Sequence, residues 1–152
     1  MLWIQYYNEV KFRILTISLV AAMYYFAYAS NLNRKQMQER CPDSQPKFRA
    51  TLPNYKLVFV GWSRLWRGAT ASIRPFRGEK VLGAIYDVSE QCLRQLDRYE
   101  SSYNRFKVTV YDEDGEPTEV VTYIKAGRSE ETRPSAEYLS VIQQGYRDWE
   151  IV

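Results

Sequence analysis

The sequence predicts an α+β fold in which a small mixed β-barrel carries peripheral helices. The chain has 152 residues, which suits one domain with its own hydrophobic core. Strand-like segments dominate its middle, and the helix-like segments are few. Aromatic residues, which favour strands, make up 15% of the chain. We therefore expect a mixed sheet that closes into a barrel.

The first residues are expected to lie outside this domain. We predict an N-terminal extension at 1–22 and a domain at 23–152. A signal peptide or a membrane anchor at 1–22 remains an alternative. The mostly apolar part of the uncharged stretch, residues 14–23, is short for a bilayer span but suits a signal peptide. However, cleavage after the Ala-Tyr-Ala at 27–29 would remove the segment interpreted below as a binding loop.

The domain opens with a strand and a short helix. Residues 23–29 are aromatic-rich and predict a buried strand. Asn31 or Asn33 can cap a helix through 37–40, and Pro42 ends it.

Three strands are expected in the middle of the chain, at 55–60, 70–74 and 80–88. Residues 61–69 contain two glycines and two tryptophans and predict a loop. Pro75 is expected to close the second of the three strands.

A hairpin and a last helix follow. Residues 105–111 and 119–124 alternate in polarity and flank the Asp-Glu-Asp-Gly turn at 112–115. Ser135 is expected to open the final helix.

Glu100 is the candidate general acid/base. Ser89 caps a predicted helix in which Leu93, Leu96 and Glu100 share one face. If the leucines enter the core, Glu100 points toward the interior or a pocket, near the negative end of the helix dipole. Both features raise a carboxyl pKa, as a base that works near neutral pH requires.

The spacing leaves an alternative open for this glutamate. Glu100 could instead bend outward at the end of the helix and pair with an arginine such as Arg94 or Arg105.

Composition excludes several kinds of site. The chain has no histidine, which removes Ser-His-Asp and Cys-His catalysis and His-ligated metals. Cys41 and Cys92 are too few and too far apart for a zinc knuckle, and Cys92 is expected to pack as a small hydrophobe. The net charge of +3 argues against a nucleic-acid binder. Catalysis must therefore rest on carboxylates, hydroxyls and backbone donors.

Four blocks of the chain resemble γ-glutamyl cyclotransferases and their AIG2-like relatives. Residues 25–32 (Tyr-Phe-Ala-Tyr-Ala-Ser-Asn-Leu) are similar to the signature Y-F-A-Y-G-S-N-L, and 81–86 to the central V-x-G-x-x-Y/W strand. Residues 96–100 resemble the L-D-x-x-E motif, with Tyr103 at the tyrosine that follows, and 134–138 resemble P-S-x-x-Y.

The resemblance implies the family's small mixed barrel and its chemistry. A γ-glutamyl amide, either a γ-glutamyl amino acid or a γ-glutamylamine, would cyclise to 5-oxoproline and release the free amine. Glu100 matches the catalytic glutamate. The residues matched to substrate contacts are Tyr25, Phe26, Ala27, Tyr28, Ala29, Ser30, Asn31, Tyr103 and Tyr138.

The resemblance also implies the partners. We expect a small-molecule γ-glutamyl substrate, no cofactor, no metal, no nucleic acid and no membrane partner, in a cytoplasmic transferase or lyase of glutathione metabolism. Two alternatives stay open: a non-catalytic AIG2-like module that binds a ligand or a protein, and an enzyme that deprotects a γ-glutamylated biosynthetic intermediate.

Two departures from the family pattern bear on the site. Ala29 replaces a glycine of the loop, which matters only if that position needs a positive φ. Ser101 replaces the glycine that often follows the glutamate, which places the end of the helix in question.

The leaving-group end of the pocket is expected at 61–69 and 125–134. The tryptophans and arginines of 62–77 are interpreted as a solvated rim over the barrel mouth, with an RNA-binding patch as the alternative. Arg67 or Arg74 could also bind a substrate carboxylate.

Overall fold

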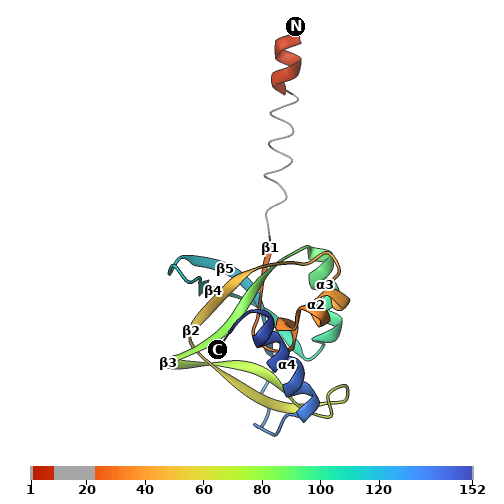
Figure 1. The fold of residues 1–152 in the computed structure, drawn as a ribbon, viewed down its shortest axis with the longest axis vertical. Helices are drawn as coiled ribbons and strands as arrows, with labels where there is room; N and C mark the ends of the chain where they lie inside the picture. Colours follow the sequence, from red (N-terminus) through yellow and green to blue (C-terminus); the bar gives the residue numbers. More distant parts are fainter. Residues whose placement is uncertain (1, 9–22, 152) are drawn as a thin grey trace.

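A computed structural model describes residues 2–8 and 23–151 of the chain (Figure 1). Residues 2–8 are helical with exposed side chains. The rest of the predicted extension, and most of its apolar stretch, lies outside the described residues. Among the described residues, no helix is both long enough and apolar enough to cross a membrane.

Five strands close into one mixed barrel, as the sequence predicts (Figure 1). They are β1 (Met23–Ala27), β2 (Gln45–Ser63), β3 (Gly68–Val88), β4 (Tyr103–Tyr111) and β5 (Pro117–Lys125). The order around the barrel is β1-β3-β2-β4-β5. Each neighbouring pair is antiparallel except β1 and β5, which run parallel and complete the closure.

The two longest strands differ from the prediction. The expected strands at 70–74 and 80–88 are parts of the single strand β3, and the expected loop at 61–69 is mostly strand around a turn at 64–67. Pro75 does not end a strand but pairs with Tyr55 across the ladder. Register shifts in β2 accommodate the residues that break the alternation, because a bulge bends a strand without ending it.

The predicted caps and turns are confirmed. Asn33, Ser89 and Ser135 each accept a hydrogen bond from a backbone N–H in the first turn of the following helix. These helices are α2 (Arg34–Arg40), α3 (Glu90–Tyr99) and α4 (Ala136–Asp148), and a 3-10 turn at Ser30–Leu32 precedes α2. The β4–β5 hairpin also forms as expected.

Strand β1 lies between two hydrophobic clusters. Its Tyr25 packs with Met37 and Leu93 in the cluster that joins the barrel to α2 and α3. Its Phe26 packs with Ile142 in the cluster that joins the barrel to α4. Because neighbouring side chains of a strand point to opposite faces, β1 is buried on both sides, and the loop that follows it has a fixed start.

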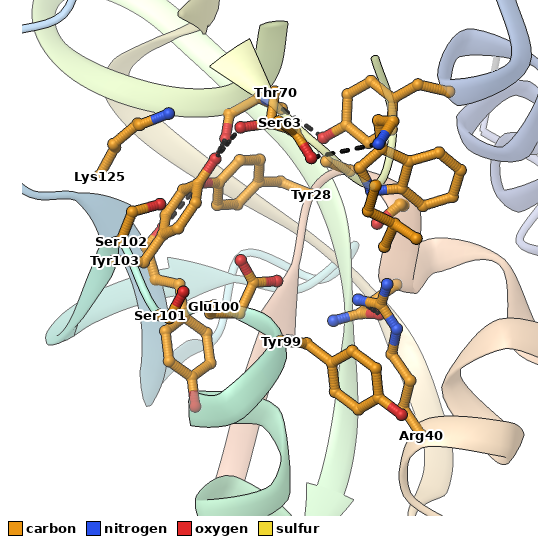
Figure 2. A pocket seen from close by; sticks show the side chains of 18 of the residues that line it. Tyr28, Arg40, Ser63, Thr70, Tyr99, Glu100, Ser101, Ser102, Tyr103 and Lys125 are labelled. Carbon is orange, nitrogen blue, oxygen red and sulfur yellow. Dashed lines mark hydrogen bonds between the residues drawn. The ribbon is translucent and has the colours of Figure 1, made fainter. Parts of the chain in front are cut away.

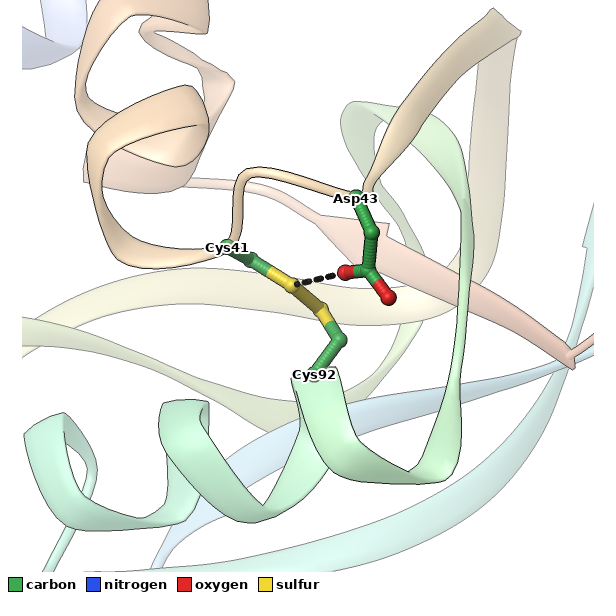
Figure 3. A group of neighbouring side chains, drawn as sticks. All are labelled: Cys41, Asp43 and Cys92. Carbon is green, nitrogen blue, oxygen red and sulfur yellow. Dashed lines mark hydrogen bonds between the residues drawn. A yellow bond between two sulfur atoms is a disulfide. The ribbon is translucent and has the colours of Figure 1, made fainter.

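The expectation that Cys92 packs as a simple hydrophobe is wrong in one respect. Cys92 is fully buried but forms a disulfide with Cys41, which lies 51 residues earlier (Figure 3). The bond joins the end of α2 to the first turn of α3. Asp43 lies beside it, with Oδ1 3.2 Å from the Cys41 sulfur, and its other oxygen accepts a hydrogen bond from the Ser89 hydroxyl.

Candidate active site

A cavity of about 360 Å³ opens at one end of the barrel (Figure 2). Its walls come from the end of β1 and the 3-10 turn, the last residues of α2 and α3, the tip of the β2–β3 hairpin, the start of β4, the end of β5 and the start of α4. The cavity therefore joins segments from almost the whole length of the domain.

Glu100 points into this cavity (Figure 2). It is the C-cap of α3, where its N–H donates to the Leu96 carbonyl at 2.9 Å and its own carbonyl accepts from the Tyr103 N–H at 2.9 Å. Leu93 and Leu96 on the same face are fully buried, as the spacing predicts. The helix thus fixes the direction of a half-buried carboxyl group.

The arginines proposed as alternative partners bind other carboxylates. Arg105 donates to Asp97 at 2.6 Å and to Glu90 at 3.0 Å, and Arg94 lies 3.8 Å from Glu90. Hydrogen bonds from Arg105 lower the pKa of Asp97. Within the described part of the chain, Glu100 forms no ion pair within 4.0 Å.

The pKa of Glu100 is raised from its ordinary 4.5 to about 7. The cause is loss of hydration in the cavity, which disfavours the charged form, and the positive charge of Arg40 opposes it only in part. A carboxyl with this pKa exchanges a proton readily at neutral pH, as a general acid/base must.

The loop after β1 is held from several directions through Asn31. The Asn31 amide donates to the Tyr25 hydroxyl at 3.0 Å, and its side-chain oxygen accepts from Gln36 at 3.1 Å and from Arg40 at 3.3 Å. Its backbone carbonyl accepts from the Tyr86 hydroxyl at 2.8 Å. Hydrogen bonds to four other residues therefore hold the loop in this conformation.

Helix α4 and the residue that follows it, Trp149, contact the same loop. The Trp149 indole donates to the Leu32 carbonyl at 2.9 Å. At Gly145, a side-chain carbon would lie 2.6 Å from the Asn33 nitrogen, so only glycine lets the helix come this close.

Most of the residues expected to contact substrate lie together at the cavity. Those that line it are Tyr25, Tyr28, Ala29, Ser30, Asn31, Glu100, Tyr103 and Tyr138. Phe26 and Ala27 do not line it, because both are buried within β1. The Phe26 carbonyl accepts a hydrogen bond from the Thr122 hydroxyl at 2.8 Å.

Neither departure from the family pattern falls at a positive φ. Ala29 has φ −136°, so the condition under which alanine would be disfavoured at this position, a positive φ, is not met. Ser101 is also outside the positive-φ region, which among the described non-glycine residues holds only Asn54, Arg67 and Glu150.

Two tyrosines of the cavity, Tyr138 and Tyr103, form hydrogen bonds with the backbone of Ala71 in β3. The Tyr138 hydroxyl accepts from the Ala71 N–H at 2.9 Å, which leaves its own proton to donate. The Tyr103 hydroxyl donates to the Ala71 carbonyl at 2.7 Å and lies 2.6 Å from the Thr70 hydroxyl. Trp66 packs against Tyr138, with ring centroids 5.0 Å apart.

Sequence reasoning missed two cations of the cavity, Arg40 and Lys125 (Figure 2). Arg40 ends the predicted helix, and Lys125 directly follows the predicted strand at 119–124. The sequence does not show which ends of the elements lie together in the fold. Arg67 and Arg74, which were considered instead, do not line the cavity, and Arg74 lies 3.5 Å from Glu131.

Comparisons with known proteins agree with this geometry. A family described as "Gamma-glutamyl cyclotransferase, AIG2-like" matches residues 25–149. Proteins named gamma-glutamylcyclotransferase from Bos taurus and Homo sapiens are 30% and 28% identical over 132 residues, covering 82% of this chain and 70% of each relative. A solved structure named gamma-glutamyl cyclotransferase has a TM-score of 0.81 at 26% identity, covering 84% of this chain and 80% of that one.

Proposed function

The chain belongs to the gamma-glutamyl cyclotransferase, AIG2-like family, and from this premise we propose that it converts a γ-glutamyl amide to 5-oxoproline and the free amine. The observation that carries the proposal is the Glu100 carboxyl, which enters the cavity without an ion pair among the described residues and has a pKa of about 7. A cavity that only bound a ligand would have no need for a carboxyl group whose charged form is destabilised by loss of hydration.

The reaction is an intramolecular acyl transfer. The α-amino nitrogen of the γ-glutamyl group attacks its own γ-carbonyl carbon, a C–N bond forms to close the ring, and the bond to the leaving nitrogen breaks. The attacking ammonium gives up two protons and the leaving nitrogen gains two, so no oxidant, metal or water is consumed. Glu100 takes a proton from the attacking nitrogen and returns it to the leaving nitrogen.

The hydrogen-bonded loop after β1 is the candidate for the remaining tasks. It holds the folded conformer of the substrate, which lowers the entropic part of the barrier. The first amides of a 3-10 turn have no acceptor within the turn, so the N–H groups of Ser30 and Asn31 are the candidate donors to the developing oxyanion. The free proton of Tyr138 can donate to a substrate oxygen.

The test is release of 5-oxoproline from γ-glutamyl amides by wild type and by Glu100→Gln. We expect the variant to bind substrate and to lose roughly 100-fold to 10,000-fold in kcat, the range of general acid/base catalysis. Glu79→Gln is the matched control, because Glu79 is exposed and does not line the cavity.

The pH dependence adds an independent check. The base must be ionised, so the wild-type rate should rise with pH through about 7, the pKa of Glu100. Substantial turnover by Glu100→Gln would contradict the mechanism.

A further inference from the structure

Among the described residues, three cations line the cavity, namely Arg40, Lys125 and the exposed Arg64 at the tip of the β2–β3 hairpin. Figure 2 shows Arg40 on one side of the Glu100 carboxyl group and Lys125 on the other, next to Tyr103. Arg40 belongs to the loop side, since it donates to Asn31 at 3.3 Å. Lys125 belongs to the opposite side, at the end of β5.

Lys125 is anchored through its backbone, and its ammonium has no charged partner among the described residues. Its backbone N–H donates to the Ser72 hydroxyl at 3.0 Å, which anchors the residue to β3. Its half-buried ammonium lies 3.5 Å from the Val60 carbonyl and 5.7 Å from the centre of the Tyr103 ring. No carboxylate of the described residues lies within 4.0 Å of it, whereas Lys107 on β4 lies 3.7 Å from Glu119.

This ammonium lies at the end of the cavity where the sequence analysis expects the leaving group. It packs against the β2–β3 hairpin, where a side-chain carbon at Gly61 would come within 2.4 Å of it. The γ-glutamyl group occupies the other end in the proposed function, between the 3-10 turn and Glu100. A substrate that spans the cavity therefore places its leaving group near Lys125.

We propose that Lys125 binds a carboxylate on the leaving group, which makes γ-glutamyl α-amino acids the preferred substrates over γ-glutamylamines. The proposal rests on the proposed function. A γ-glutamyl α-amino acid carries one carboxylate on its γ-glutamyl part and one beside the leaving nitrogen. Arg40 lies at the end of the cavity that takes the first carboxylate and Lys125 at the end that takes the second, where Lys125 is half-buried and Arg64 is exposed. A simple amine would leave the Lys125 ammonium partly desolvated without an anion to compensate it.

The decisive comparison uses γ-glutamyl-alanine and γ-glutamyl-alaninamide, which differ only in the carboxylate of the leaving group. We expect wild type to favour γ-glutamyl-alanine by roughly 10-fold to 100-fold in kcat/KM, as for a hydrogen bond between charged groups. Lys125→Met should reduce that ratio to near one, and Lys125→Arg should keep part of it. Lys107→Met removes the same charge outside the cavity and should keep the whole ratio.

The outcomes separate this inference from the proposed function. A wild-type ratio near one, with 5-oxoproline still released, would overturn the role of Lys125 and leave the cyclisation standing. An undiminished ratio in Lys125→Met would do the same. No release from either substrate would overturn the cyclisation itself and this inference with it. The ratio is insensitive to partial misfolding, because both substrates meet the same fraction of folded enzyme.

Discussion

The Glu100 carboxyl group is held where its charge is disfavoured, and this has a consequence for stability. Its pKa is about 7 in the folded chain against an ordinary value of 4.5. Between these two values the folded state keeps a proton that the unfolded state has lost. The free energy of unfolding should therefore fall as pH rises through this window, and the cost is complete above pH 7.

Replacement of this one residue should make the protein more stable while abolishing its proposed activity. We expect Glu100→Gln to raise the free energy of unfolding at pH 8 by about 1–3 kcal/mol, less than the full pKa shift implies because the side chain is only half-buried. The gain should vanish below pH 4.5, where both states of the wild type are protonated. Urea denaturation at pH 4 and pH 8 measures the difference, and Glu79→Gln should show none. A variant no more stable than wild type at pH 8 would show that the carboxylate is not destabilised.

The sequence reveals some residues of the site and not others. Leu93, Leu96 and Glu100 could be assigned to one face because helical spacing is local geometry. Arg40 and Lys125 could not be found, because they are 85 residues apart (125 minus 40) and come to line one cavity only when the barrel closes. Helical spacing alone allowed Glu100 either to enter a pocket or to pair with an arginine. The family motif was needed to favour the pocket.

At the scale of the elements, a disulfide joins helices α2 and α3, and each helix contributes a residue to the cavity. The disulfide links Cys41, directly after Arg40, to Cys92, in the helix that ends at Glu100. Caps such as Asn33 and Ser89 were predictable from the sequence, because a cap depends on a few neighbouring residues. The disulfide was not, because the pairing depends on how two helices approach one another.

The disulfide should contribute measurably to stability. It closes a loop of 51 residues, and a cross-link of this span removes enough freedom from the unfolded chain to be worth about 2–4 kcal/mol. We expect a reducing agent to lower the midpoint of urea denaturation of the wild type accordingly. The double variant Cys41→Ala/Cys92→Ala should start lower and should not respond to the reducing agent. An unchanged wild-type midpoint, with both thiols shown to be reduced by mass spectrometry, would contradict this.

At the scale of the whole molecule, barrel closure brings the candidate site together. The barrel closes because β1 pairs with β3 on one side and with β5 on the other. Its class was predictable from many strands and few helices, and the family resemblance supported it. The strand bounds were less predictable, because the bulges that keep β2 and β3 continuous depend on ladder partners distant in the sequence.

The last prediction concerns how much of the chain this barrel needs. Every strand pair of the barrel lies within residues 23–125, and the candidate site draws only on residues from Tyr25 to Tyr138. We therefore expect a chain that starts at Met23 to keep its free energy of unfolding to within about 0.5 kcal/mol and its rate of 5-oxoproline release to within about twofold.

The matched contrast is a chain that also lacks residues 23–27. It loses β1, so β3 and β5 keep unpaired edges and the loop that holds Asn31 loses its start. We expect this chain not to fold, as circular dichroism and urea denaturation would show. If the chain from Met23 were itself unstable or inactive, residues 1–22 would belong to the working domain, and the boundary at residue 23 would be wrong.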